Sequence, residues 1–213
     1  MSLTLYVGNQ RYSSWSLRGY LIVARSGAAF DMNVIWLDVD DTASSIAKVS
    51  PAGRVPVLVD GDLAIWDTLA IGEYMNEQFP AAQLWPADRA RRARARSISA
   101  EMHSGFVELR THMPMDLGAN KPGHGHTPGA LADAQRVQEI WRDALAVSGG
   151  PFLFGQFTIA DAMYAPVATR FKSYGVEVDA TCRAYMEAIE GLPELARWRA
   201  DAANEQAKAK LKL

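Results

Sequence analysis

The segment SPAGRVPVL (residues 50–58) contains the feature that most restricts the fold, a proline directly before a run of β-forming residues. Because proline cannot donate a hydrogen bond to a β-ladder, it normally occupies an edge strand or the first position of a strand. Residues 57–59 and 63–66 flank the sequence Asp-Gly-Asp, which is a strong hairpin-turn signal. The segment therefore predicts a loop that enters a β-hairpin through Pro56.

The Val55–Pro56 peptide bond has two possible states. A trans bond suits an ordinary edge proline, whereas a cis bond costs only about 0.5–1 kcal/mol more. A cis bond would turn the backbone N–H and C=O of Val55 outward, where an extended peptide could pair with them as an added strand. From the sequence alone the trans bond is modestly favoured, and both the cis and the trans bond stay possible.

Around this hairpin, strand and helix patterns alternate. The apolar alternation and β-branched content predict strands, and the spacing of apolar residues from Ser14 predicts a helix. The expected elements are a strand at 3–8, a helix from 14 to about Gly27, a strand at 32–37, a short helix at 42–49, the hairpin, and a helix at 67–79. The order β-α-β-α-β-β-α within residues 1–80 predicts a small mixed sheet with helices on its faces.

Beyond residue 80 the strand patterns stop. Residues 81–87 have the composition of a linker, and residues 88–213 are predicted to be all-helical. The expected helices are 88–113, 130–147, 159–174, 184–189 and 193–203. The fold class is therefore an α/β domain followed by an all-α domain.

Composition excludes several functional classes. Among 213 residues, 22 Lys and Arg oppose 24 Asp and Glu, a net charge of −2 that argues against a nucleic-acid partner. The single cysteine, Cys182, excludes an internal disulfide and a multi-cysteine metal site. Neither a signal-peptide core nor a run of eighteen apolar residues is present, so we expect a soluble, cytoplasmic protein with no metal and no membrane partner.

Two polar segments follow predicted strands. Residues 12–18, Tyr-Ser-Ser-Trp-Ser-Leu-Arg, lie between the first strand and the first helix, at the sheet edge where open α/β sheets bind ligands. Hydroxyls at a helix start are usually caps, but three serines and a tyrosine exceed what capping requires. Asp67 and Thr68 open the helix after the hairpin, foremost as an N-cap and secondarily as a carboxylate site.

The whole chain resembles bacterial members of the cytosolic glutathione S-transferase superfamily. Residues 50–58 resemble the family's N-P-x-G-K-V-P-x-L segment, and residues 67–71 resemble its E-S-x-A-I segment. Residues 157–161 resemble its S-x-A-D helix start, which is also a capping box. Residues 13–18 are most similar to the S-S-C-S-W-R stretch of the serine-type zeta class, with theta-like classes next, but Trp15 replaces the cysteine.

The resemblance implies a thioredoxin-like domain at 1–80, a linker at 81–87 and a helical domain at 88–213 that lines an electrophile site. It also implies a homodimeric detoxification enzyme with glutathione as cosubstrate, whose proline at position 56 is cis. Ser13 is expected to donate a hydrogen bond to the thiolate, with Ser14 and then Tyr12 as its rivals. The expected glutathione-binding residues are Arg54 for the glycine carboxylate, Val55 beside Pro56 for the cysteinyl backbone, and Asp67 with Thr68 for the γ-glutamyl end.

The same resemblance implies a pocket for a small hydrophobic electrophile between the loop at 10–15 and the helical domain. Its expected residues are Trp15, His103, Phe106, Arg110 and Met113, with Met102 and Trp141 as further candidates. Arginine and aromatic residues together indicate a planar or acidic electrophile. Three alternatives stay open: a glutathione-dependent isomerase of the maleylacetoacetate type, an ether-cleaving enzyme, and a non-catalytic glutathione-binding or regulatory relative.

Two further clusters favour structural roles. The arginines at 89, 91, 92, 94 and 96 are spread around one predicted helix, which indicates a solvated face or a subunit contact. His124 and His126 lie in a glycine-rich loop without a third ligand nearby, so a flexible loop is the better interpretation than a metal site.

Overall fold

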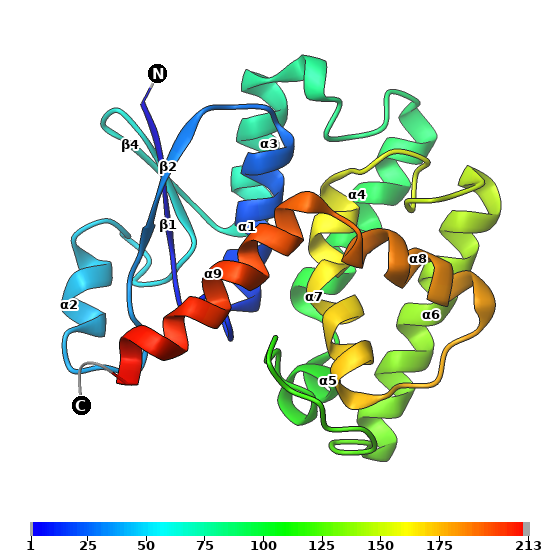
Figure 1. Ribbon diagram of the computed structural model, residues 1–213. Coiled ribbons are helices and arrows are strands. Elements are labelled where there is room, and N and C mark those ends of the chain that lie inside the picture. Colours follow the sequence, from blue (N-terminus) through cyan, green and yellow to red (C-terminus); the bar gives the residue numbers. More distant parts are fainter. Residues whose placement is uncertain (1, 211–213) are drawn as a thin grey trace. The chain divides into compact units, whose positions relative to one another are not determined.

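The computed structural model describes the chain over residues 2–210 and divides it into two compact units (Figure 1). The first unit contains the residues up to Leu84 together with those from Arg197 onward, and the second is Trp85–Ala196. The first unit holds a β-sheet, whereas the second is mainly helical. The predicted combination of an α/β part with an all-α part is confirmed.

The sheet of the first unit is mixed, with the strand order β2-β1-β3-β4. β1 pairs in parallel with β2 and antiparallel with β3, and β3 forms the predicted hairpin with β4. In Figure 1, α1 and α3 lie on one side of the strands and α2 on the other. The elements are β1 (Leu3–Val7), α1 (Ser14–Arg25), β2 (Phe30–Val34), α2 (Thr42–Ala47), β3 (Val57–Asp60), β4 (Leu63–Trp66), α3 (Thr68–Gln78) and a 3-10 turn η1 (Pro80–Ala82).

The core of this unit follows from the residue pattern. Leu3, Leu5 and Val7 alternate with half-buried residues along β1, which is the period expected of a strand with one fully covered face. α1 packs against α3 and buries Leu17 and Leu21 completely. The apolar face of α1 predicted from the sequence is therefore the face that is buried in the core.

The second strand was predicted two to three residues too late. The β-branched run begins at Met32, but β2 occupies Phe30–Val34 because it pairs with β1 from Leu3↔Phe30 to Val7↔Val34. After Val34 only one more backbone bond continues the ladder, from Ile35 N–H to the Val7 carbonyl at 2.8 Å. The short length of β1 thus ends the strand before the apolar run ends.

The second unit contains the helices α4 to α8 and the first residues of α9. Their bounds are α4 (Arg89–Ser104), α5 (Val107–His112), α6 (Pro128–Ser148), α7 (Ile159–Tyr174), α8 (Ala180–Glu190) and α9 (Pro193–Lys210). α4 packs on α7, and α5 packs on α6. The helix predicted at 159–174 is confirmed residue for residue, and α8 begins earlier than predicted because Asp179 caps it.

A single helix over residues 88–113 was also predicted, and this is wrong. The helix breaks between Ser104 and Val107, where Phe106 has a left-handed backbone with φ of +60°. A Cβ at Gly105 would lie 2.8 Å from the Glu101 carbonyl oxygen, so the break requires glycine there. Arg110 stabilises the broken end by donating to the carbonyls of residues 102, 103 and 105.

The predicted capping box at the start of α7 is present and buried. The Asp161 carboxylate accepts hydrogen bonds from the Thr158 N–H at 2.8 Å, the Thr158 hydroxyl at 2.9 Å and the Leu153 N–H at 3.0 Å. Asp161 and Thr158 are both fully buried. One side chain therefore fixes the helix start and ties it to the preceding loop.

We expect Asp161→Ala to destabilise the fold by about 3 kcal/mol or more, because it leaves buried backbone donors unpaired. Asp88→Ala is a matched control, since Asp88 caps α4 from an exposed position through one bond to the Arg91 N–H. That change is expected to cost only about 1 kcal/mol. Urea unfolding of both variants tests the difference, and equal losses would contradict it.

The same carboxylate predicts a pH dependence of stability. Burial raises the pKa of Asp161 to about 6, although hydrogen bonding to Leu153, Thr158 and Tyr185 acts in the opposite direction. An unfolded aspartate titrates near pH 4, so between about pH 4 and 6 the native state holds a proton that the unfolded state has lost. The free energy of unfolding contributed by this group therefore falls as the pH rises through that window, by about 3 kcal/mol in total.

Comparison with Asp161→Asn isolates this titration, because the amide does not ionise. The stability difference between wild type and this variant is expected to shrink from pH 4 to pH 6 and to level off above about pH 7. Urea unfolding at a series of pH values measures it. A difference that grows with pH would mean that the carboxylate is ionised throughout.

Candidate functional site

Three chain segments lie at the same end of the neighbouring strands β1, β3 and β4, and this end is called the sheet edge below. The register places Tyr6 of β1 beside Val57 of β3, and Val57 beside Trp66 of β4. The segments that continue from these three positions are 8–13, 54–56 and 67–68. Because neighbouring strands are about 4.8 Å apart, the antiparallel pairing brings together the residues that sequence analysis assigned to glutathione.

The loop between β1 and α1 is held by Asn9. Its carbonyl accepts the Tyr12 N–H at 3.3 Å and the Ser13 N–H at 2.9 Å, so the backbone turns directly into the helix. Its side-chain oxygen accepts the Leu37 N–H at 2.7 Å, which anchors the turn to the segment after β2. The position of Ser13 therefore depends on the conformation of residues 9–12.

Ser13 is the N-cap of α1, and its hydroxyl contacts another serine. The Ser13 hydroxyl donates to the Ser16 Oγ at 2.8 Å and accepts the Ser16 N–H at 3.4 Å. Ser16 is fully buried, and its Oγ also accepts the Gly8 N–H at 2.8 Å. Each hydroxyl can both donate and accept, so the Ser13–Ser16 bond can reverse its direction and release the Ser13 proton toward a ligand.

The other two candidate hydroxyls lie in different surroundings. The Ser14 Oγ is buried and accepts a hydrogen bond from the Arg18 guanidinium at 3.4 Å, and that guanidinium stacks over the Trp15 ring at 4.6 Å. The Tyr12 side chain is 55% exposed, beside the Arg11 guanidinium. Ser13, Ser14 and Tyr12 thus have distinct partners, and Ser16, which was not among the predicted site residues, is the hydroxyl bonded to Ser13.

The Val55–Pro56 bond is cis. The preceding turn is closed by Ser50, whose hydroxyl donates to the Arg54 carbonyl at 2.7 Å and accepts the Arg54 N–H at 3.1 Å. Pro56 packs directly on α1, because a Cβ at Gly19 would lie 2.9 Å from the proline ring. The Arg54 side chain is exposed, Val55 is half-buried and Pro56 is buried.

The third segment begins α3. Asp67 has φ of +70°, an unusual conformation for a residue with a Cβ, and its carboxylate caps the helix by accepting the Leu69 N–H at 2.9 Å. Thr68 is almost fully buried. Capping, the primary role expected of Asp67, is confirmed. The first backbone N–H groups of a helix have no intrahelical acceptor, so they also suit a carboxylate ligand.

The residues expected to line the electrophile pocket lie in varied environments. Met113 and Met102 are fully buried, Trp141 lies in an aromatic core cluster, and Phe106 is buried at the break between α4 and α5. Trp15 and His103 are half-buried. Arg110 donates a hydrogen bond to the Gly105 carbonyl at the end of α4. Burial lowers the pKa of Arg110, and the negative charge of Asp133 acts in the opposite direction. A pocket role for these residues stays a prediction.

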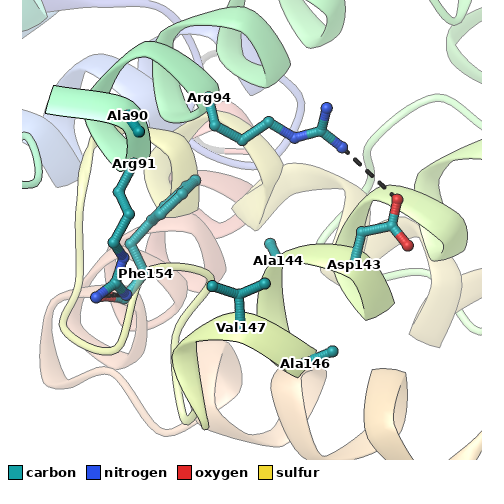
Figure 2. Close-up of a pocket in the computed structure, with 8 residues that line it drawn as sticks. All are labelled: Ala90, Arg91, Arg94, Asp143, Ala144, Ala146, Val147 and Phe154. Atoms are coloured by element: carbon teal, nitrogen blue, oxygen red, sulfur yellow. Dashed lines mark hydrogen bonds and ion pairs between the residues drawn. The ribbon is translucent and has the colours of Figure 1, made fainter. Parts of the chain in front are cut away.

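A hollow of about 490 Å³ lies between α4 and α6, and Figure 2 shows the residues around it. Arg94 and Asp143 form an ion pair at 3.6 Å on one side, and Arg91 donates to the Phe154 carbonyl at 2.8 Å on the other. The remaining lining residues are Ala90, Ala144, Ala146 and Val147. No residue expected in the electrophile pocket lines this hollow.

The basic run on α4 makes contacts within its own unit. Besides Arg91 and Arg94, Arg92 donates to the carbonyls of residues 86 and 87, and Arg96 stacks over Trp85. Within residues 2–210, no cluster of three or more His, Cys, Asp or Glu side chains could hold a metal ion. No helix in this part of the chain is long and apolar enough to cross a membrane.

Known proteins resemble between about half and nearly all of the chain. A stringent starvation protein A homolog from Coxiella burnetii is 24% identical over 83% of this chain and 79% of its own. A probable maleylacetoacetate isomerase from Caenorhabditis elegans is 33% identical over 49% of each chain. The crystal structure of a Burkholderia glutathione transferase homolog with bound glutathione has a TM-score of 0.73 at 23% identity, covering 96% of this chain and 99% of its own.

Family models cover both parts of the chain. The N-terminal domain of glutathione S-transferase matches residues 12–78, which include the segments 54–56 and 67–68 and the last two residues of segment 8–13. The C-terminal domain of glutathione S-transferase matches residues 90–201, more than half of the sequence. The chain therefore belongs to the glutathione S-transferase family.

Proposed function

We propose that this protein is a glutathione transferase that binds glutathione at the common edge of β1, β3 and β4 and activates its thiol with Ser13. The observation that carries the proposal is the register from Tyr6 through Val57 to Trp66, which gathers the three binding segments. The family's typical homodimer and a cytoplasmic detoxifying role belong to the same proposal.

Each part of the tripeptide has a matching group along that edge. The backbone of Val55, beside cis-Pro56, pairs with the cysteinyl residue as an added strand would. The hydroxyl and N–H of Thr68 bind the γ-glutamyl carboxylate at the start of α3, while Asp67 faces the ammonium group. The exposed Arg54 binds the glycine carboxylate through a charge-assisted hydrogen bond.

Ser13 then stabilises the anionic form of the thiol. A free thiol has a pKa of about 8.5, so little of it is thiolate at neutral pH. Lowering that pKa by about two units requires about 2.7 kcal/mol of preferential stabilisation of the anion. A hydrogen bond from the Ser13 hydroxyl, supported by the positive end of α1, supplies stabilisation of this kind. The bond that Ser13 now donates to Ser16 would then reverse, so that Ser16 donates to Ser13.

The thiolate lone pair forms a C–S bond with the electrophile. In a substitution the leaving group departs with its bonding electrons, and in an addition the electron pair moves onto the acceptor and is then protonated. The thiol proton passes to solvent in the earlier ionisation. Cys182 takes no part, because it is buried and burial raises its pKa to about 12.

The proposal includes an acidic electrophile, because the residues expected in the pocket combine an arginine with aromatic rings. Arg110 and Arg170 are two neighbouring cations in the second unit, where burial and then the charge of Arg110 lower the pKa of Arg170 to about 10. A carboxylate on the substrate would offset this repulsion between like charges. Such a substrate also suits the second candidate function, glutathione-dependent isomerisation of an unsaturated acid, which agrees with the name of the nematode relative.

We expect Ser13→Ala to raise the pKa of the bound glutathione thiol toward its free value and to lower kcat/KM at neutral pH by about 100-fold. The reason is that the main donor to the thiolate is lost. An ultraviolet titration of thiolate absorbance in the binary complex measures the pKa, and turnover of a chlorinated nitroaromatic measures the rate.

Ser14→Ala is the matched control, because that hydroxyl is bonded to Arg18. It should leave the thiol pKa close to the wild-type value. If Ser14→Ala moves the pKa and Ser13→Ala does not, the donor assignment is wrong. A wild-type protein that binds glutathione at its ordinary thiol pKa and turns over no electrophile is a non-catalytic binding relative.

The charge preference is tested with a matched pair of substrates, an unsaturated keto acid and its methyl ester. We expect kcat/KM to be about tenfold higher for the acid, which corresponds to about 1.4 kcal/mol of added interaction with the two arginines. Product analysis then separates the reactions, because isomerisation returns free glutathione and transfer consumes it. A preference for the ester would contradict the acidic substrate class and leave the hydrophobic electrophile.

A further inference from the structure

The last helix of the chain holds the loop that leads into α1. The carboxylate of Glu205 in α9 accepts the Gln10 N–H at 2.7 Å through one oxygen and the Arg11 N–H at 3.2 Å through the other. Trp198 donates its indole N–H to the Gln10 carbonyl at 2.7 Å. Both sides of the loop backbone at Gln10 are therefore bonded to a segment nearly two hundred residues away.

The two contacts with Gln10 are buried, the contact with Arg11 is partly buried, and all three come from one face of the helix. Trp198, Asp201 and Glu205 are spaced three and four residues apart, which aligns them along α9. Trp198 is fully buried and Glu205 is 7% exposed, while Gln10 is 3% exposed. The Trp198 ring also packs on Tyr20 of α1, with ring centroids 4.8 Å apart.

The held backbone lies directly before Ser13. The Ser13 N–H bonds to the Asn9 carbonyl, so residues 10 and 11 lie inside the turn that sets where the Ser13 hydroxyl points. A rotation of the Gln10 or Arg11 peptide would carry Ser13 with it. Hydrogen bonds lose strength steeply when their geometry is poor, so the orientation of this turn governs how well Ser13 can serve a thiolate.

Burying the Glu205 carboxylate against the loop costs desolvation free energy. Burying a negative charge requires strong hydrogen bonds in return, and two backbone N–H donors provide them. A negative charge near the thiol would by itself oppose formation of a thiolate. By fixing the loop Glu205 would lower the thiol pKa, whereas its negative charge alone would raise it. Because the two effects have opposite signs, removing the charge shows which of them dominates.

We propose that Glu205 and Trp198 are positioning residues of the thiol site, which fix the backbone at residues 10–11 so that Ser13 is aimed at the glutathione sulfur. This inference rests on the proposed function and adds α9 to the machinery of the first unit. It makes thiol activation depend on the C-terminal helix.

The test uses three variants of the full-length protein. Glu205→Gln retains one acceptor oxygen but turns an N–H donor toward the second backbone donor. Trp198→Phe removes the indole N–H and keeps an aromatic ring on Tyr20. Asp201→Asn is the charge-matched control, because it removes a negative charge one turn away whose contact with the Gln10 side chain is long, at 3.5 Å.

We expect Glu205→Gln to raise the pKa of the bound glutathione thiol by about one unit and to lower kcat/KM at neutral pH by about tenfold. Trp198→Phe should act in the same direction with a smaller effect, and Asp201→Asn should leave the thiol pKa near the wild-type value. At a pH where the thiol ionises without help, the rate of the Glu205 variant should recover. A purely structural role would lower the rate at every pH.

The inference is overturned if Glu205→Gln leaves the thiol pKa unchanged or lowers it, the latter being the sign of a bare charge effect. Should that variant fail to fold, Trp198→Phe decides by the same readout. If Ser13→Ala raises the pKa while neither α9 variant does, only the positioning role fails. If wild-type protein shows no lowered thiol pKa at all, the proposed function fails and the positioning role fails with it.

Discussion

The antiparallel pairing of β1 with β3 is the constraint on which the site depends. It sets Tyr6 opposite Val57, and the hairpin sets Val57 opposite Trp66, so one end of three neighbouring strands carries the serine loop, the cis-proline turn and the start of α3. A slip of one residue in this register would exchange the two faces of β1 and expose Leu5. The hydrophobic core of the first unit therefore also maintains the geometry of the site.

Buried carboxylates perform the same physical task in both units. Asp161 ties a loop to the start of α7, and Glu205 ties the loop before α1 to α9. In each case two backbone N–H groups bond to the carboxylate, which offsets the loss of water around the charge. Loop geometry in this protein is thus set by electrostatics as well as by packing.

The sequence predicted those elements whose formation depends on residues near one another in the chain. The hairpin follows from its turn residues, α7 from its capping box, and α1 from the spacing of Leu17 and Leu21. The errors arose where tertiary contacts decide. Pairing with β1 ends β2 early, and the break at Phe106 is stabilised by an arginine of the following helix. The contact between Glu205 and Gln10 has no local signature, because it joins residues 195 apart.

Ser16 shows why a site can be located from sequence more easily than its chemistry can be assigned. Four hydroxyls lie within residues 12–16, and their order along the chain does not distinguish a donor from a support. The fold separates them by their partners: Ser16 bonds to Gly8 and Ser13, Ser14 to Arg18, and Tyr12 is mostly exposed. Since Ser16 already receives the Gly8 N–H, its own proton is free to turn toward Ser13, which would polarise the Ser13 hydroxyl for an anionic ligand. The serine at the helix cap thus acts as one member of a hydrogen-bonded chain that begins at the end of β1.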